Sequence, residues 1–373
     1  MHKNNARRQF LQQSIKLFSY LGSSLAFPAF ANIFFNPYDE QRIKQTAKHT
    51  LNFCSPYPSH DYQFAPHMHA YLKKNIQEMS AGQIYVNIID NGLQGIGTEL
   101  MAKVSRGHIE AALVSVSNLS PAAPALDILN IPFWSASNQD YLNLITSPTW
   151  QNLINKQIYA QGKIDILFHY VPGARTLTST KKYNKIIKKP EDIQDIIFRV
   201  PSSKVLKNFY QLAGNTPINV NWRNVANLAR NGRIQAMDPG IIGLYNGPDG
   251  LRDHIGTISQ IDSVHDGWVA VISQHWLNNL PPRLRIVLRD AADKTFLDHL
   301  RITPEITQHC ITGLKNRGCK LYRPTEEEKQ QWIELCGHQR PEWRATKKKL
   351  LGKEALFSQL LEATQQNNGY DIG

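Results

Sequence analysis

The stretch Phe198-Arg199-Val200-Pro201-Ser202-Ser203 places an arginine at the end of a short apolar run that begins at Ile196. Such a run predicts a strand, and ligands of open α/β sheets bind outside the carboxyl ends of strands. Arginine is planar, permanently charged and bidentate toward carboxylates, which lysine is not. From these residues alone, Arg199 is either a structural arginine paired with a neighbouring acid or a fixed cation for an anionic ligand.

Apolar runs and helical spacing alternate on both sides of this segment, which is typical of α/β proteins with parallel sheets. Pro281-Pro282 introduces a long helix, which Pro304 is expected to kink or break. Thr325-Glu326-Glu327-Glu328 is a capping box that opens a further helix. The predicted strands cover residues 50–54, 84–89, 111–116, 164–170, 196–200, 218–220 and 234–237.

The chain of 373 residues is long enough for two lobes, each with its own core. No Gly/Ser-rich linker separates them, so we expect ordered connectors that include the long helix. The predicted first lobe comprises residues 50–172 plus 265–303, and the predicted second lobe comprises residues 173–264 plus 304–373. Two such lobes joined by several crossings suit a protein with a ligand cleft between them.

The N-terminus reads as an export signal. Arg7-Arg8 precedes a moderately apolar segment, 15–29, which ends in the small-x-small pattern Ala29-Phe30-Ala31. The paired arginines favour the twin-arginine route of bacteria, and the alternative is an ordinary signal with incidental arginines. We therefore expect residues 1–31 to be removed and the mature protein to lie in the periplasm.

Charge and cysteine usage give weaker indications. Without the signal segment the formal net charge falls from +12 to +8, because Lys3, Arg7, Arg8 and Lys16 are lost. The basic clusters are short and lack interleaved aromatics, so we predict no nucleic-acid partner and expect an attraction for anionic ligands.

The four cysteines are Cys54, Cys310, Cys319 and Cys336. Their pairing stays open: Cys310–Cys319, Cys319–Cys336 or four buried thiols all fit.

Signals for an enzyme are weak. The stretch Gly92-Leu93-Gln94-Gly95-Ile96-Gly97 has its glycines in the wrong order for a dinucleotide loop. No nucleophile elbow or phosphate-binding loop occurs in the sequence. We predict no catalysis, no cofactor and no metal site.

Two further residues near strand ends suit a binding site. Arg175, in the segment 172–176, supplies a second cation, and two such arginines favour an anion clamp more than one does. Trp222 is either core packing or an apolar wall of a pocket, and Asn224 is expected to cap the helix that follows it.

A series of short motifs runs through the chain in a fixed order. In sequence order they are Ser80-Ala81-Gly82-Gln83-Ile84, Asn91-Gly92-Leu93-Gln94-Gly95, Arg106-Gly107-His108-Ile109-Glu110-Ala111-Ala112, Asn130-Ile131-Pro132-Phe133, Lys189-Pro190-Glu191-Asp192-Ile193, Phe198-Arg199-Val200-Pro201, Leu280-Pro281-Pro282 and Ala291-Ala292. The series resembles the dicarboxylate-binding (DctP-like) solute-binding proteins of tripartite (TRAP) transporters. Each motif is weak by itself, and the collinear order from Thr50 to Lys329 is specific.

The resemblance implies a two-lobed fold like that of periplasmic binding proteins, with an interlobe cleft that closes on an organic acid and a long connecting helix. It implies that Arg199 pairs with the ligand carboxylate and that Arg175 is a second ligand arginine. It places Trp222 at an aromatic position of the site and Ser202 on the segment after the main arginine. We also expect Tyr170 to exclude water from the cleft.

One segment departs from the family pattern. Asp238 stands where the family has an acid and is expected to contact the ligand, but Pro239 replaces an asparagine that binds ligand in some members. Proline has neither an N–H nor a side-chain amide, so the finer specificity does not transfer.

These features predict a solute-binding protein that captures a small organic acid and delivers it to a two-subunit TRAP permease. One alternative is a ligand sensor of the same fold that feeds a signalling protein. Another is an exported oxidoreductase, since twin-arginine export often serves cofactor proteins.

Overall fold

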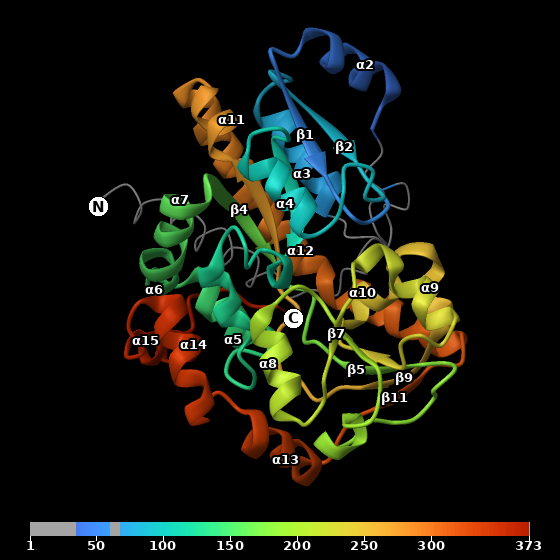
Figure 1. The fold of residues 1–373 in the computed structure, drawn as a ribbon. Helices are drawn as coiled ribbons and strands as arrows, with labels where there is room; N and C mark the ends of the chain where they lie inside the picture. The colour runs from blue at the N-terminus through green and yellow to red at the C-terminus, as the bar shows by residue number, and fades with distance from the viewer. Residues whose placement is uncertain (1–34, 60–67, 373) are drawn as a thin grey trace, which may run out of the picture.

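The computed structural model describes residues 35–59 and 68–372, so the predicted signal peptide, residues 1–31, lies outside the described residues. The described strands form two sheets, each flanked by helices (Figure 1). The first sheet has the strand order β2-β1-β3-β10-β4, and the second has the order β11-β9-β5-β8-β6-β7. No helix of the described residues is long and apolar enough to cross a membrane.

The first sheet contains β1 (His49–Cys54), β2 (Ile84–Ile89), β3 (Ala111–Ser115), β4 (Ile164–Tyr170) and β10 (Trp268–Ser273). β1 pairs in parallel with β2 and β3, as the alternation of strands and helices predicts. β10 lies antiparallel between β3 and β4. Every residue of β10 is buried, which explains its continuous apolar sequence. The sheet is therefore mixed, since the alternation predicts its parallel pairs but gives no sign of the strand from late in the chain that returns antiparallel through the centre.

The second sheet contains β5 (Leu177–Thr180), β6 (Phe198–Val200), β7 (Ile218–Asn219), β8 (Ala236–Met237), β9 (Ile255–Ser259) and β11 (Lys320–Tyr322). It repeats the plan of the first: β7, β6 and β8 are parallel, and β5 is antiparallel between β8 and β9. In both sheets the antiparallel strand is the one that has just crossed from the other sheet. β6 ends at Val200, so Arg199 is its central residue.

Helices cover both sheets, and one helix follows Pro281 and another follows Thr325, as the sequence predicts. α8 begins after Ser203, whose hydroxyl accepts a hydrogen bond from the backbone N–H of Leu206. The α-helices are α2 (Pro37–Thr46), α3 (Met68–Met79), α4 (Thr98–Ser105), α5 (Asn138–Thr146), α6 (Pro148–Trp150), α7 (Lys156–Gly162), α8 (Lys204–Leu212), α9 (Val225–Arg230), α10 (Ile241–Tyr245), α11 (Gln274–Asn279), α12 (Pro282–Asn316), α13 (Glu326–Cys336), α14 (Arg344–Leu351) and α15 (Leu356–Thr364).

The long helix α12 joins the two halves of the molecule. It continues without a break through Pro304, so the expected break at this proline is wrong. Proline costs one backbone hydrogen bond, but buried side chains on both sides of it, such as Leu300 and Ile306, hold the helix in place. α12 packs against α3 and β4 of the first half and against α10 of the second. Packing at both ends of α12 therefore outweighs the tendency of proline to interrupt a helix.

Two further connections run side by side between the sheets. The segment 171–176 leads from β4 to β5, and the segment 260–267 leads from β9 to β10. The backbone N–H of Arg175 donates to the carbonyl of Val264 (2.7 Å), and that of Asp266 donates to the carbonyl of Gly173 (2.9 Å). We call these paired segments the hinge. The lobe boundaries drawn from the sequence remain a prediction, and α15 packs against α5, which that division places in the other lobe.

All four cysteines are free thiols and buried in the structure. Burial raises the pKa of Cys54, Cys310 and Cys336 to about 12, and that of Cys319 to about 11. Of the alternatives that the sequence left open, the structure contains four buried thiols.

Candidate functional site

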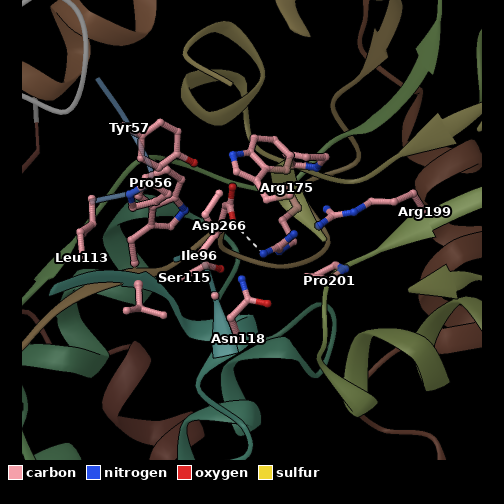
Figure 2. Close-up of a pocket in the computed structure, with 15 residues that line it drawn as sticks. Pro56, Tyr57, Ile96, Leu113, Ser115, Asn118, Arg175, Arg199, Pro201 and Asp266 are labelled. Atoms are coloured by element: carbon pink, nitrogen blue, oxygen red, sulfur yellow. Dashed lines mark ion pairs between the residues drawn. The ribbon is translucent and has the colours of Figure 1, made fainter. Parts of the chain in front are cut away.

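A small cavity lies between the two sheets, beside the hinge (Figure 2). Its walls include the carboxyl ends of β3 and β6 and the loops that follow β1 and β8, where ligands of α/β sheets bind. The cavity volume is about 50 Å³. The lining residues are Pro56, Tyr57, Ile96, Gly97, Leu113, Val114, Ser115, Asn118, Arg175, Arg199, Pro201, Trp222, Pro239, Asp266 and Trp268.

Arg199 brings a buried cation into this cavity. Its side chain extends from β6 toward the centre of the site and is 3% exposed (Figure 2). Nε and one terminal nitrogen donate to the carbonyl of Val220, at 3.1 and 3.0 Å, and the guanidinium lies 5.3 Å from the centre of the Trp222 ring. Within the described part of the chain, no carboxylate forms an ion pair with it. Burial lowers the pKa of Arg199 to about 10, although Asp238 opposes the shift.

Arg175 also lines the cavity, but its charge is already compensated. One terminal nitrogen lies 3.3 Å from Asp238, and the other lies 2.7 Å from Asp266 and 2.8 Å from the hydroxyl of Ser117. Burial alone would lower the pKa of Arg175, yet Asp266 and Asp238 outweigh it and raise the pKa. The structure therefore brings the two predicted arginines together in two different electrostatic states.

Asp238 stands behind Arg175 and is not among the lining residues. It is fully buried, and the hydroxyl of Tyr210 donates to it at 3.4 Å. Burial raises the pKa of Asp238, and the two arginines only partly offset this. Its contact is with Arg175, which makes it a partner of the hinge arginine in this structure.

Aromatic side chains form the walls of the site. Trp222 is 9% exposed, lines the cavity and also packs in a buried apolar cluster, so the structure combines the two alternatives for this residue. Tyr57 and Trp268 stack face to face with ring centres 4.2 Å apart and an angle of 23° between the planes. The indole N–H groups of Trp222 and Trp268 are buried and have no hydrogen-bond partner among residues 35–59 and 68–372. Asn221 caps the turn that carries Trp222, because its side chain accepts from the N–H of Arg223. Asn224 stands at the N-cap position of the next helix, as expected, but its side chain makes no capping hydrogen bond there.

The other two predicted residues lie outside the lining. The backbone N–H of Ser202 donates to Asn118 across the cleft at 3.5 Å. Tyr170 is fully buried and packs on His299 of α12, with ring centres 3.9 Å apart. Tyr170 also contacts the ring of Trp268 from behind, with ring centres 6.1 Å apart. It therefore supports a wall of the cavity without facing it.

Residues 63–346 match the model of the bacterial extracellular solute-binding proteins, family 7 (DctP). The chain belongs to this family. The likeness to TRAP solute-binding proteins that the collinear motifs indicated is thereby confirmed.

Individual relatives of family 7 are distant in sequence and close in fold. The C4-dicarboxylate-binding protein DctB of Bacillus subtilis is 20% identical over 264 residues, which are 69% of this chain and 72% of DctB. A TRAP periplasmic solute-binding protein from Shewanella oneidensis, with bound succinate, superposes with a TM-score of 0.75 at 18% identity, covering 85% of this chain and 100% of that one. The sugar-acid-binding protein of Advenella mimigardefordensis, with bound galactonate, superposes with a TM-score of 0.75 at 16% identity, covering 85% of this chain and 97% of that one. These superpositions confirm the two-lobed α/β fold class.

The lining residues of this family 7 protein that the sequence reasoning missed include Tyr57, Asn118, Asp266 and Trp268. Tyr57 follows β1 in a polar loop, so a strand-end rule applied to every strand would have included it. Asp266 and Trp268 come from the hinge and β10, which no periodic signal marked. Within the described residues no cluster of three or more His, Cys, Asp or Glu side chains is placed to hold a metal ion.

Proposed function

We propose that this protein captures a small organic acid in the cavity between the sheets, and that Arg199 binds the ligand carboxylate. The observation that carries the proposal is a guanidinium that is 3% exposed, points into the cavity and has no carboxylate partner among the described residues. A buried charge without a counter-charge is costly, and a ligand carboxylate would supply that counter-charge. The membership in a family of solute-binding proteins supports this assignment.

Arg175 has a different part in the proposal. Its ion pairs with Asp238 and Asp266 connect the loop after β8 to the hinge, directly beside the cavity. We assign to it the positioning of the hinge and a contact with the ligand at the edge of the site. Ser202 and Tyr170 support the walls of the site, and Trp222 covers the ligand from the side of the second sheet.

Closure of the two halves over the ligand would report that the site is occupied. Contacts across the cleft are available in the structure: a terminal nitrogen of Arg223 donates to the carbonyl of Gly92 at 2.6 Å. Ile96, from the first half, packs into the core cluster that contains Trp222. A ligand favours closure only by binding the closed state more tightly than the open one, and a carboxylate held by both halves does so.

The remaining parts of the proposal rest on the family and on the sequence. We infer that the protein is exported to the periplasm by the twin-arginine route, acts without catalysis, and delivers its ligand to a two-subunit TRAP permease. Uptake of the ligand by cells that carry the permease pair, with and without this protein, separates delivery from a sensor role. Uptake that does not depend on the protein would contradict the delivery step.

A thermal-shift screen of organic acids tests the carboxylate site. We expect at least one acid to raise the melting temperature of the wild type and of Arg230→Ala, a matched change at an exposed arginine on α9. The same acid should leave the melting temperature of Arg199→Ala unchanged, because the described lining then offers the ligand carboxylate no unpaired cation. An equal shift in both variants would refute the role of Arg199.

A further inference from the structure

The lining of the cavity restricts which organic acid fits, and this inference rests on the proposed function. We propose that the ligand is a short monocarboxylate that carries an uncharged hydrogen-bond acceptor, of the 2-oxo acid type. Three features of the lining carry the proposal: its charge balance, its unpartnered donors and its volume.

The charge balance favours a single carboxylate. Arg175 is held between Asp238 and Asp266, so its positive charge is compensated within the protein. Among the described residues of the lining, Arg199 is left as the cation available to a ligand. A monoanion uses this cation fully, whereas the second carboxylate of a dicarboxylate would be buried beside Asp266 without a counter-charge of its own.

The unpartnered donors favour an acceptor on the ligand. Among the described lining residues, three buried N–H groups lack a partner: Nε1 of Trp222, Nε1 of Trp268 and Nε of Arg175. An indole N–H donates and cannot accept. A carbonyl oxygen accepts and cannot donate, so a keto group matches these donors better than a hydroxyl group, which also needs an acceptor.

The acceptors of the lining are mostly occupied. The two oxygens of Asp266 bond to Arg175 and to the backbone N–H of Gly240. At position 239 a proline faces the cavity, and its carbonyl already accepts from Thr176. A polyhydroxylated sugar acid would therefore bury hydroxyl groups without partners, which costs binding energy.

The volume favours a short ligand. A cavity of about 50 Å³ has room for roughly four water-sized groups. Apolar side chains such as Pro56, Ile96 and Leu113 close its other sides, which suits a short alkyl end. The six-carbon sugar acids exceed this space.

Calorimetric titration of the wild-type protein with matched acids tests the proposal. Pyruvate against propionate isolates the keto oxygen, and we expect pyruvate to bind about tenfold more tightly. 2-Oxovalerate against 2-oxoglutarate isolates the second carboxylate at constant chain length, and we expect the dianion to bind at least about tenfold more weakly. Succinate and gluconate should bind more weakly than pyruvate.

Two variants locate the acceptor contact. Trp222→Phe and Trp268→Phe keep an aromatic ring and remove the N–H group. If these groups bind the keto oxygen, at least one variant lowers the preference for pyruvate over propionate, whereas a packing defect weakens both acids alike. An unchanged preference in both variants would contradict this contact.

The outcomes separate the two proposals. Equal or tighter binding of propionate, 2-oxoglutarate, succinate or gluconate would overturn the monocarboxylate assignment and leave the carboxylate site intact. Absence of binding by every acid, in a protein shown to be folded, would overturn the proposed function itself.

Discussion

Arg199 and Arg175 are almost equally buried, yet their surroundings give them opposite electrostatic roles. Arg175 compensates two buried carboxylates, whereas Arg199 contacts a backbone carbonyl and an aromatic ring. The sequence predicts both as strand-end cations and cannot separate them. The acids that pair with Arg175 lie 63 and 91 positions away in the sequence, and only the fold brings them together.

This difference predicts stability losses of different size for two alanine variants. Arg175→Ala leaves Asp238 and Asp266 buried without a counter-charge, so we expect the free energy of unfolding to fall by about 3–5 kcal/mol. Arg199→Ala removes an unpaired cation, and we expect a loss within about 1 kcal/mol. Urea unfolding without ligand measures both values. Losses of similar size would show that Arg199 is also a structural arginine.

Buried histidines predict how stability depends on pH. Burial lowers the pKa of His169 to about 3, and it also lowers the pKa of His265 well below its usual value. Below pH of about 6.5 the unfolded chain therefore binds protons that the folded protein does not, and stability decreases as the pH falls toward 3. Each such histidine contributes a slope of about 1.4 kcal/mol per pH unit.

His169→Gln tests this linkage. Its unfolding free energy should fall less steeply between pH 6 and pH 4 than that of the wild type, by about 1.4 kcal/mol per unit. His275→Gln, at an exposed histidine after β10, serves as the control and should keep the wild-type slope. Identical slopes for all three proteins would contradict the buried neutral state of His169.

At the scale of elements, the local sequence predicts a helix or strand that buries one regular face. It fails where packing against distant segments determines the conformation. α8 buries Val205, Leu206 and Phe209 on one side, and their spacing in the sequence is that of one helical face. β5 has the polar sequence Leu177-Thr178-Ser179-Thr180, and only its place between β8 and β9 makes it a strand. The same holds for α12, where packing overrides Pro304.

Pro304 gives a prediction at this scale. Its side chain is exposed, so Pro304→Ala removes little packing and restores a backbone N–H within α12. We expect the free energy of unfolding to rise by about 2 kcal/mol. Proline in a helix interior costs about 3 kcal/mol, and its removal offsets part of this gain because the unfolded chain becomes more flexible. A decrease measured by urea unfolding would indicate that the helix depends on the proline.

At the scale of the whole molecule, the collinear motifs predict the family and the two-lobed fold. They also identify Arg199, Arg175 and Trp222, which line the cavity. They miss Tyr57, Asp266 and Trp268, because a site between two sheets combines residues that share no local pattern. The shared plan of the two sheets explains this. In each half, a strand that has just crossed from the other sheet, β5 or β10, enters beside the site.

The state of the four cysteines belongs to the same scale, since each of them lies in a core. We expect no thiol of the native protein to react rapidly with a thiol reagent, because burial keeps all four protonated. After denaturation without a reducing agent, four thiols should react. A count of two or zero would show that disulfides form in the exported protein.

The most direct test of the central claim is a calorimetric titration with a bound acid and with its uncharged primary amide. We predict that the wild type binds the acid and not the amide, and that Arg199→Ala loses about 2–5 kcal/mol of binding free energy for the acid. Binding of the acid by Arg199→Ala with undiminished affinity would contradict the account.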